Sequence, residues 1–209
     1  MTKIDFKKTL KHLYKPPKKF GIVHVPKMQF LMVHGHGDPN TARSYQDAIE
    51  TLYALAYKIK FISKNELGKD YVVPPLEGLW WAENMDAFTV NLDKSQWDWT
   101  MMIMTPDWIS ASVFDNALSQ VRSRKNPAAL DLARLETYDE GLSAQIMYLG
   151  AYADEGPTIR ALHQFIAAEG GLLNGKHHEI YLGDPRRMAA EKLKTIIRQP
   201  MRLDERQHG

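Results

Sequence analysis

The sequence predicts an α+β fold in which a β-α-β-β module occurs twice, with pseudo-twofold symmetry between the copies. A strand-like run, a helix and two further strand-like runs follow one another in residues 25–105, and the same order returns in residues 140–202. The composition, 44% hydrophobic and 25% charged, is ordinary for a globular protein. We expect helices on one side of the sheets and a cleft on the other.

The first module begins with MQFLMVHGHG (28–37), a strand-like run that ends in glycines. Asp38-Pro39-Asn40 supplies start signals for a helix, and apolar residues recur at helical spacing to about residue 59. YVVPPLEGLWW (71–81) is extended and aromatic, and WDWTMMIM (97–104) follows as the last strand.

The second module begins with LSAQIMYLG (142–150), again strand-like and ended by glycine. Pro157 suits the first turn of a helix, and Gly170-Gly171 ends that helix. HHEIYLGDP (177–185) and KLKTIIRQP (192–200) are the remaining strands.

Three segments lie outside the two modules. Residues 107–124 are predicted to form a helix that links them. Residues 1–24 are basic and are either a nucleic-acid arm or a short surface helix with a solvated lysine face, which is the reading we favour. Residues 203–209 are expected to be a flexible tail, which leaves residues 25–202 as a single domain.

Composition and charge limit the function. The net charge of +2 is too small to require nucleic acid or a membrane as a partner. The absence of cysteine excludes disulfides, thiolate metal sites and cysteine nucleophiles. No apolar run has the length of a membrane helix, and no signal peptide is present, so the cytoplasm is the expected location. The sequence does not indicate an oligomeric state.

HHEIYLGDP raises the question of a metal site. A zinc-binding helix needs His-Glu-x-x-His, but Leu182 stands where the second histidine would be. The segment is better explained as a strand, whose side chains alternate between two faces. One face is polar and suits a cleft, and the other is mostly apolar and suits packing under helices. The polar face carries His177, Glu179 and Tyr181, and the other carries His178, Ile180 and Leu182.

Three segments of the second module carry a family resemblance when they are taken together: QIMYLGAYADEGPTIRAL, HHEIYLGDPRR and KLKTIIRQP. They resemble the GyrI-like small-molecule-binding domain, which also forms the effector-binding part of multidrug-sensing transcription regulators. PLEGLWW and WDWTMMIMTPD resemble a stand-alone branch of that family. The resemblance covers residues 25–202, and residues 1–25 are too few for the DNA-binding domain of the regulators.

The resemblance implies a hydrophobic, aromatic-lined ligand cleft with a glutamate near its floor, which by motif match is Glu179. Such clefts take up cationic or flat lipophilic compounds. Members of the stand-alone branch are associated with hydrolytic opening of electrophilic cyclopropane rings. The protein is therefore either a hydrolase that uses carboxylate acid and base catalysis or a non-catalytic drug-binding or effector-sensing protein. No cofactor is expected.

A second candidate catalytic residue comes from superposing the two modules. PLEGLWW then falls over HHEIYLG, so that Glu77 matches Glu179 and would face it across the cleft as an acid or as the group that orients water. Two facing carboxylates would move their pKa values apart, as acid and base roles require. The candidate ligand-binding residues are Trp81, Trp97, Trp99, Tyr148, Tyr152, Tyr181 and His177.

Other signals have alternative explanations. HGHGD (34–38) could bind a metal, but its glycines more simply make the turn into the helix. Tyr148 and Tyr152 either line the cleft or only pack and donate hydrogen bonds. Asp154 and Glu155 are either pocket acids or residues that favour a helix N-terminus.

Overall fold

The computed structural model describes residues 2–83 and 93–204. The α+β class is confirmed, since helices accompany antiparallel strands. The chain divides into two compact units. The first consists of Met1–Thr9, Met28–Pro74 and Gly78–Tyr138, and the second of Leu10–Lys27, Pro75–Glu77 and Asp139–Gly209. The chain crosses from the second unit to the first within strand β3 (Leu76–Trp81).

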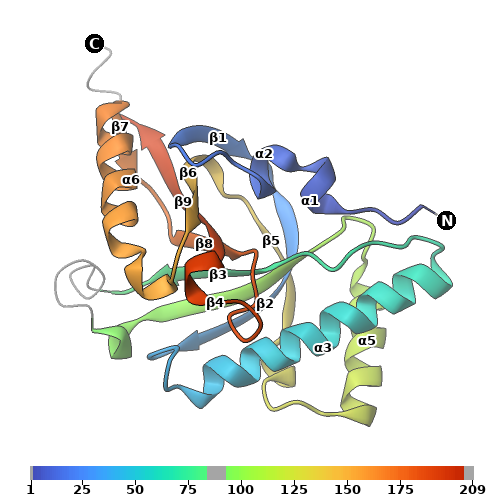
Figure 1. The fold of residues 1–209 in the computed structure, drawn as a ribbon. Coiled ribbons are helices and arrows are strands. Elements are labelled where there is room, and N and C mark those ends of the chain that lie inside the picture. The colour runs from blue at the N-terminus through green and yellow to red at the C-terminus, as the bar shows by residue number, and fades with distance from the viewer. Residues whose placement is uncertain (1, 84–92, 205–209) are drawn as a thin grey trace. The chain divides into compact units, whose positions relative to one another are not determined.

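The first unit packs one long helix on antiparallel strands in the order β5-β2-β4-β3. Helix α3 contacts β2 and β4, and α5 contacts α3 (Figure 1). The elements are α1 (Phe6–Thr9), β2 (Met28–His36), α3 (Arg43–Glu66), η1 (Lys94–Gln96), β4 (Asp98–Thr105), α5 (Ala111–Arg124), η2 (Leu130–Leu132) and β5 (Arg134–Tyr138).

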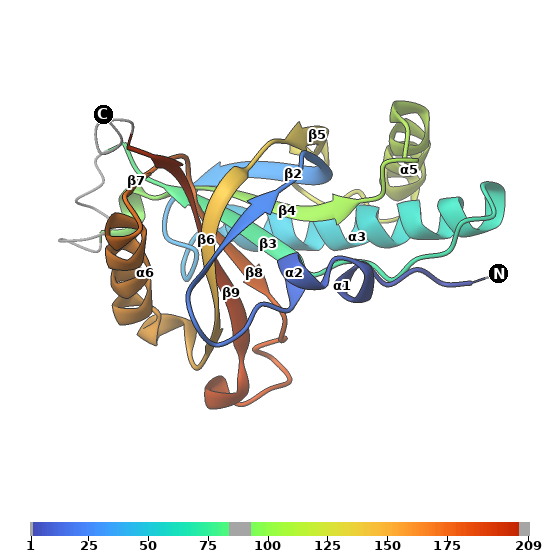
Figure 2. The same ribbon diagram turned by 90° about the horizontal axis from the view of Figure 1, so that it is seen from above.

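The second unit packs α6 on strands in the order β1-β6-β9-β8, with β7 paired to the end of β9. Both ribbon views place α6 alongside these strands (Figures 1 and 2). The elements are α2 (Lys11–Tyr14), β1 (Gly21–Val25), β6 (Gly141–Leu149), η3 (Tyr152–Asp154), α6 (Gly156–Ala168), β7 (Gly171–Leu173), β8 (His177–Tyr181), η4 (Ala190–Lys192) and β9 (Lys194–Leu203).

The two units repeat one internal topology, which confirms the predicted duplication. In each, the first and last strands of the β-α-β-β module pair with each other, as β2 with β4 and β6 with β9. In each, an outer strand then pairs with the first strand, as β5 with β2 and β1 with β6. The sequence did not predict these short outer strands. The twofold relation between the modules stays a prediction.

Three predicted boundaries were wrong. Helix α3 begins at Arg43, because the Asp38 side chain instead closes a turn by accepting from the backbone N–H of Asn40 at 2.9 Å. The helix then continues to Glu66 rather than to about residue 59. Strand β9 runs beyond Pro200 to Leu203, since its end pairs with β7.

The longest helix of each unit, α3 or α6, buries an apolar stripe against its own strands. Leu52, Leu55 and Ile59 of α3 are 0% exposed. In the second unit, Leu162 and Ile166 of α6 pack with a cluster of strand residues, Ala144, Ile146, Ile197 and Met201. Burial of such side chains is the main favourable term in folding.

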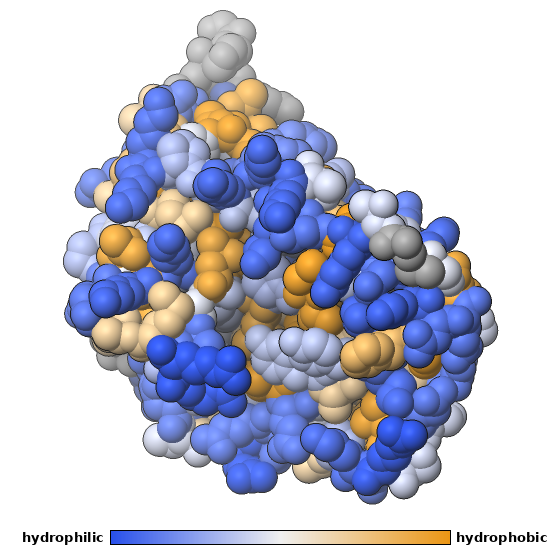
Figure 3. All heavy atoms as spheres, turned by 45° about the vertical axis from the view of Figure 1, so that its right-hand side comes forward, coloured by the Kyte–Doolittle hydropathy of each residue, from blue (hydrophilic) through white to orange (hydrophobic). Residues whose placement is uncertain are grey.

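The hydrophilic surface and the helix lengths match what the sequence composition predicts. On the face drawn in Figure 3, hydrophilic side chains predominate and apolar ones form small groups. Within residues 2–83 and 93–204, no helix is both long enough and apolar enough to cross a membrane. Residues 205–209 of the predicted tail lie outside the described residues.

Candidate functional site

Strand β8 carries Glu179 in the register that the sequence predicts. The strand pairs antiparallel with β9, which places His178 opposite Arg198 and Glu179 opposite Ile197. Consecutive side chains of a strand point to opposite faces, so His177, Glu179 and Tyr181 share one face.

The face that carries Glu179 is the one covered by α6. Its cross-strand neighbour Ile197 belongs to the apolar cluster that α6 buries. Glu155, the residue before α6, lies within hydrogen-bonding contact of Glu179. The sequence predicted helices over the His178 face, whereas the longer helix α6 covers the Glu179 face. The His178 face instead carries polar, fully buried partners next to the short helix α2, and sequence alternation cannot distinguish the two cases.

Glu179 is held as a carboxylate by its neighbours. It accepts hydrogen bonds from His177 Nε2 at 3.2 Å and from the Tyr181 hydroxyl at 2.7 Å. Burial opposes ionisation of Glu179. The hydrogen bond and charge of His177, together with hydrogen bonds from Tyr181 and Glu155, outweigh burial and lower the pKa of Glu179. Its side chain remains 15% exposed, so a ligand can reach it.

Glu155 is the second carboxyl group of this site. It is 2% exposed, and burial, followed by the charge of Glu179, raises its pKa to about 9, although the Thr195 hydroxyl acts in the opposite direction. Glu155 is therefore protonated at neutral pH while Glu179 is ionised. Its neighbour Asp154 is exposed. Glu155 stands both beside Glu179 and at the N-cap of α6, so the two alternatives for this acidic pair stay open.

The same site concentrates polar atoms that lack partners. Six buried side-chain atoms in the described part of the chain form no hydrogen bond of ordinary geometry, and four of them belong to Glu179's neighbours. These four are Glu155 Oε1, His163 Nε2, His177 Nδ1 and Thr195 Oγ1. An unsatisfied buried polar group costs about 1–3 kcal/mol, so such a concentration favours a site that a polar ligand completes.

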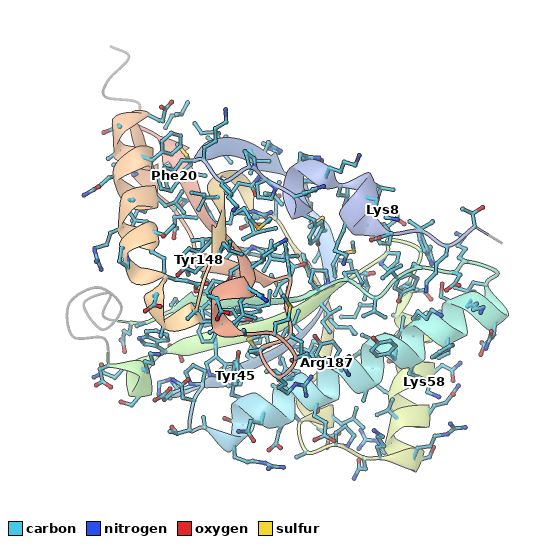
Figure 4. The ribbon with its side chains drawn as sticks, viewed as in Figure 1. Lys8, Phe20, Tyr45, Lys58, Tyr148 and Arg187 are labelled. Atoms are coloured by element: carbon cyan, nitrogen blue, oxygen red, sulfur yellow. The ribbon has the colours of Figure 1, made fainter. Side chains whose placement is uncertain are left out.

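The tyrosines around Glu179 both pack and donate hydrogen bonds. The Tyr152 and Tyr181 rings meet edge to face with centroids 5.3 Å apart. Tyr152 donates to the Gly183 carbonyl at 3.4 Å, and Tyr148 donates to the Ala151 carbonyl at 3.2 Å. Tyr148 also packs against the apolar cluster under α6, and Figure 4 places it beside that helix. We define the Glu179 site as Glu179, Glu155, His163, His177, Tyr181 and Thr195, flanked by Tyr148 and Tyr152.

Glu77 lies elsewhere, and the predicted face-to-face arrangement with Glu179 was wrong. Glu77 is 0% exposed and accepts hydrogen bonds from the Tyr14 hydroxyl at 2.8 Å and from His178 Nε2 at 3.0 Å. Because His178 and Glu179 point to opposite faces of β8, Glu77 is on the side away from Glu179.

Glu77 belongs to a buried ionic network with His178, Glu140 and Arg198. His178 donates to Glu140 from Nδ1 at 2.9 Å, and Arg198 donates to Glu140 at 3.1 Å. Burial opposes the charge on His178, but Glu140 and Glu77 outweigh it and raise the pKa to about 9. Burial likewise opposes ionisation of Glu140, but His178 and Arg198 lower its pKa to about 2.

The network also anchors the segment before β1. Arg198 donates to the Leu13 carbonyl at 2.7 Å, and Gln145 donates to the His12 carbonyl at 2.7 Å. Sequence analysis missed this network because its members are far apart along the chain and none forms a motif.

Trp99 is packed in the interior of the first unit, and its assignment to the ligand site stays a prediction. It is 0% exposed, meets Tyr45 of α3 edge to face, and donates from Nε1 to the Gly37 carbonyl at 3.2 Å. The ring lies over Gly35, where a Cβ would stand 2.1 Å from it. The sequence signal was present in the glycine, which permits this close approach.

Trp81 and Trp97 are partly exposed residues of the first unit. Trp97 meets Trp80 edge to face at 5.9 Å. Their assignment to the ligand site stays a prediction.

The histidines of HGHGD have separate partners. His34 hydrogen-bonds to Thr100, and His36 pairs with Asp98 at 2.8 Å. The parts of the chain that the structure describes contain no group of three His, Asp or Glu side chains arranged to hold a metal. A small pocket lies beside His34, lined also by Ser44, Asp47 and Trp99.

Comparison with known proteins supports a small-molecule site. The model of the GyrI-like small molecule binding domain matches residues 18–202. An uncharacterized conserved protein from Listeria innocua is 40% identical, with a TM-score of 0.88 and coverage of 96% of this chain and 100% of that chain. A hydrolase from Listeria innocua is 40% identical, with a TM-score of 0.86 and the same coverage.

A more distant structure shares the fold alone. The EcmrR C-terminal domain is 10% identical, with a TM-score of 0.55 and coverage of 89% of this chain and 98% of that domain. No curated protein sequence matched the chain.

Proposed function

Because the chain belongs to the GyrI-like small-molecule-binding domain family, we propose that it binds lipophilic cationic or flat aromatic compounds, with Glu179 as their counterion. The observation that carries the proposal is an ionised, largely buried carboxylate that remains reachable beside two tyrosine rings. Small lipophilic molecules are the proposed partners, and the cytoplasm is the proposed location.

The physical basis is the low dielectric around Glu179. A cation attracts a buried carboxylate more strongly than one in water, because fewer solvent dipoles screen the charge. The faces of Tyr152 and Tyr181 would add apolar contact and attraction to a cation of about 0.5–2 kcal/mol. Since His177 and Tyr181 already orient the carboxylate, less freedom is lost when a ligand binds.

Ethidium, a flat aromatic monocation, tests the proposal through the fluorescence change on binding. We expect Glu179→Gln to keep the fold and to weaken ethidium binding by about 1–3 kcal/mol, the usual cost of losing a charged partner. Glu169→Gln removes a carboxylate from an exposed position at the C-terminal end of α6 and serves as the control. Equal affinities for wild type and Glu179→Gln would remove Glu179 from the ligand site.

A second candidate function is hydrolysis, which the 40% identical hydrolase from Listeria innocua favours. The substrate class that the family resemblance implies is an electrophilic cyclopropane conjugated to a carbonyl group. Water oxygen would bond to a ring methylene, a ring carbon–carbon bond would break, and its electron pair would move to the carbonyl oxygen. Glu179 would take the proton that water loses, and the carbonyl oxygen would gain a proton from an acid.

Mass spectrometry distinguishes hydrolysis from sequestration. A cyclopropane-bearing alkylator incubated with less than one equivalent of protein should gain the mass of water over many turnovers if the protein is a hydrolase. In that case Glu179→Gln should slow turnover by about 100-fold or more. Recovery of the intact alkylator with unchanged mass would support a protein that binds without chemistry.

A further inference from the structure

We propose that Glu155 is the second acid of the ligand site and that Glu155 and Glu179 share one proton, so that the site matches a ligand with one positive charge. A ligand with two charges would bind fully only after that proton leaves. The inference rests on the proposed function, because it takes Glu179 as the group that meets the cation.

The first support is contact between two buried carboxyl groups. Glu155 is 2% exposed and lies within hydrogen-bonding contact of Glu179. Two carboxylates at such separation repel strongly in a low dielectric, and retention of one proton removes the repulsion. The hydrogen bonds from His177 and Tyr181 go to Glu179, so Glu179 is the member that stays ionised.

Among the described residues, Glu179 supplies the charge that acts on Glu155, and no cation opposes it. Glu179 faces it from β8 and Tyr148 from β6, and the charge of Glu155 acts to raise the pKa of Tyr148, after burial. On α6, burial and then His177 lower the pKa of His163. The N-terminus of α6 favours a carboxylate through its dipole, but burial and Glu179 outweigh it, since the Glu155 pKa is raised.

The second support is independent of titration. Glu155 Oε1, His177 Nδ1 and His163 Nε2 are buried and form no hydrogen bond of ordinary geometry among the described residues. His177 Nε2 bonds to the Glu179 carboxylate, so the buried Nδ1 of that ring is left for a ligand. The unpartnered Glu155 oxygen can accept a hydrogen bond, so the site suits an aromatic monocation that carries N–H donors.

Charge arithmetic gives the expected selectivity. A monocation neutralises the single charge of the pair. A dication gains its second partner only when Glu155 ionises. The pKa of Glu155 is about 9, so pH 7 is about two pH units below it. Ionising Glu155 at pH 7 therefore lowers the affinity for a dication by about 100-fold, which is tenfold for each pH unit.

Ethidium and propidium test this directly, because they share one amino-substituted ring system and carry one and two positive charges. We expect propidium to bind wild-type protein more weakly than ethidium at pH 7, and the gap to narrow by at least tenfold by pH 9. Glu155→Gln should remove that pH dependence, since Gln imitates the protonated acid. Asp154→Asn, which removes an exposed carboxylate one residue away, should keep it. A ratio of affinities that is independent of pH in wild type would overturn the inference.

Carboxyl carbon NMR separates the inference from the proposed function. We expect one glutamate, lost in Glu155→Gln, to titrate far above its ordinary range, and its pKa to fall in Glu179→Gln. Titration of Glu155 near 4.5 would overturn the shared proton even if ethidium binds at Glu179. Unchanged ethidium binding in Glu179→Gln, with a high Glu155 pKa, would instead overturn the ligand role of Glu179. Glu155→Asp, which keeps the acid on a shorter stem, replaces Glu155→Gln if circular dichroism shows that the latter does not fold.

Discussion

At the scale of single residues, Glu179 owes its charge to the side chains two positions away on each side. A strand brings residues i−2, i and i+2 to one face, so His177 and Tyr181 reach the same carboxylate without any long-range contact. Burial alone would have neutralised that carboxylate. The local sequence His-x-Glu-x-Tyr thus supplies two of the hydrogen bonds that keep this carboxylate ionised on a buried strand, and Glu155 adds a third.

Tyr181→Phe should raise the pKa of Glu179 and weaken ethidium binding by about 1–2 kcal/mol, because it removes a 2.7 Å hydrogen bond to a charged group. Isothermal titration calorimetry measures the affinity. Tyr152→Phe is the matched control, since the Tyr152 hydroxyl donates to the Gly183 carbonyl and the ring stays in place. An effect of Tyr152→Phe as large as that of Tyr181→Phe would contradict a specific role for the Tyr181 hydroxyl.

The sequence predicted which residues share a face with Glu179 but not which carboxyl group lies beside it. Glu77 was chosen by superposing two strands, yet Glu77 bonds to His178 on the opposite face. Glu155 was recognised only as one of two alternatives for an acidic pair. The alternation of side chains shows which residues of a strand share a face. It does not show which of the two faces a helix covers, because that depends on long-range packing. For β8 both faces are buried, so hydrophobicity did not distinguish them.

At the scale of elements, strands β2 and β4 are fitted together by a glycine and a tryptophan. Gly35 pairs directly with Trp99, and the indole occupies the space where a side chain of Gly35 would be. The sequence predicted both strands from their composition but placed Trp99 in a cleft. A glycine in the neighbouring strand is the signal that a large ring packs over it.

Gly35→Ala should therefore destabilise the protein by about 1–3 kcal/mol or more, because the new Cβ would stand 2.1 Å from the Trp99 ring. Urea unfolding followed by tryptophan fluorescence measures the change. Gly21→Ala adds the same methyl group to a strand position where nothing lies within 4 Å, and it should leave stability nearly unchanged. If the two variants unfold at the same urea concentration, the close packing of Trp99 on Gly35 is not rigid.

The short helix α2 is held by a side-chain hydrogen bond from Tyr14 as well as by burial of Leu13. Tyr14→Phe should destabilise the protein by about 1–3 kcal/mol, because one oxygen of the fully buried Glu77 would lose its donor. Tyr57→Phe, at a position that is 53% exposed, is the control and should have little effect on thermal unfolding. Equal melting temperatures for both variants would show that water can replace the Tyr14 hydroxyl.

At the scale of the whole molecule, periodicity predicted the duplicated module but not the outer strands. Helical and strand periods reflect burial within one element, and so α3, α6 and the strands they cover were found. Strands β1 and β5 have five residues each, with several exposed side chains, and they form because neighbouring strands offer hydrogen bonds. The ionic network was hidden for the same reason, since Glu77, Glu140 and Arg198 meet only after folding.

The buried titratable groups predict how stability depends on pH. His178 has a folded pKa of about 9, above its ordinary 6.5, so its stabilisation is complete below 6.5 and is lost as pH rises through 9. Glu155 keeps its proton in the folded state up to about 9, whereas the unfolded chain releases it above about 4.5, so stability also falls with pH in that range. Glu140, with a pKa of about 2, and Glu179 both have lowered pKa values in the folded state. Their ionised forms therefore stabilise the folded protein above pH 4.5, and that contribution is lost as the pH falls.

Stability should therefore be greatest near pH 4.5 and decline on both sides, with Glu155 acting from about 4.5 and His178 adding to the decline above about 6.5. On the alkaline side His178 and Glu155 each contribute a slope of at most about 1.4 kcal/mol per pH unit. Urea unfolding at intervals from pH 4 to 10 measures the curve. Glu155→Gln should flatten the decline between pH 5 and 9, because Gln has no proton to release, while Glu191→Gln, at an exposed position, should not. Constant stability from pH 5 to 9 in wild type would mean that water reaches both groups in the folded state and that neither holds its proton through burial.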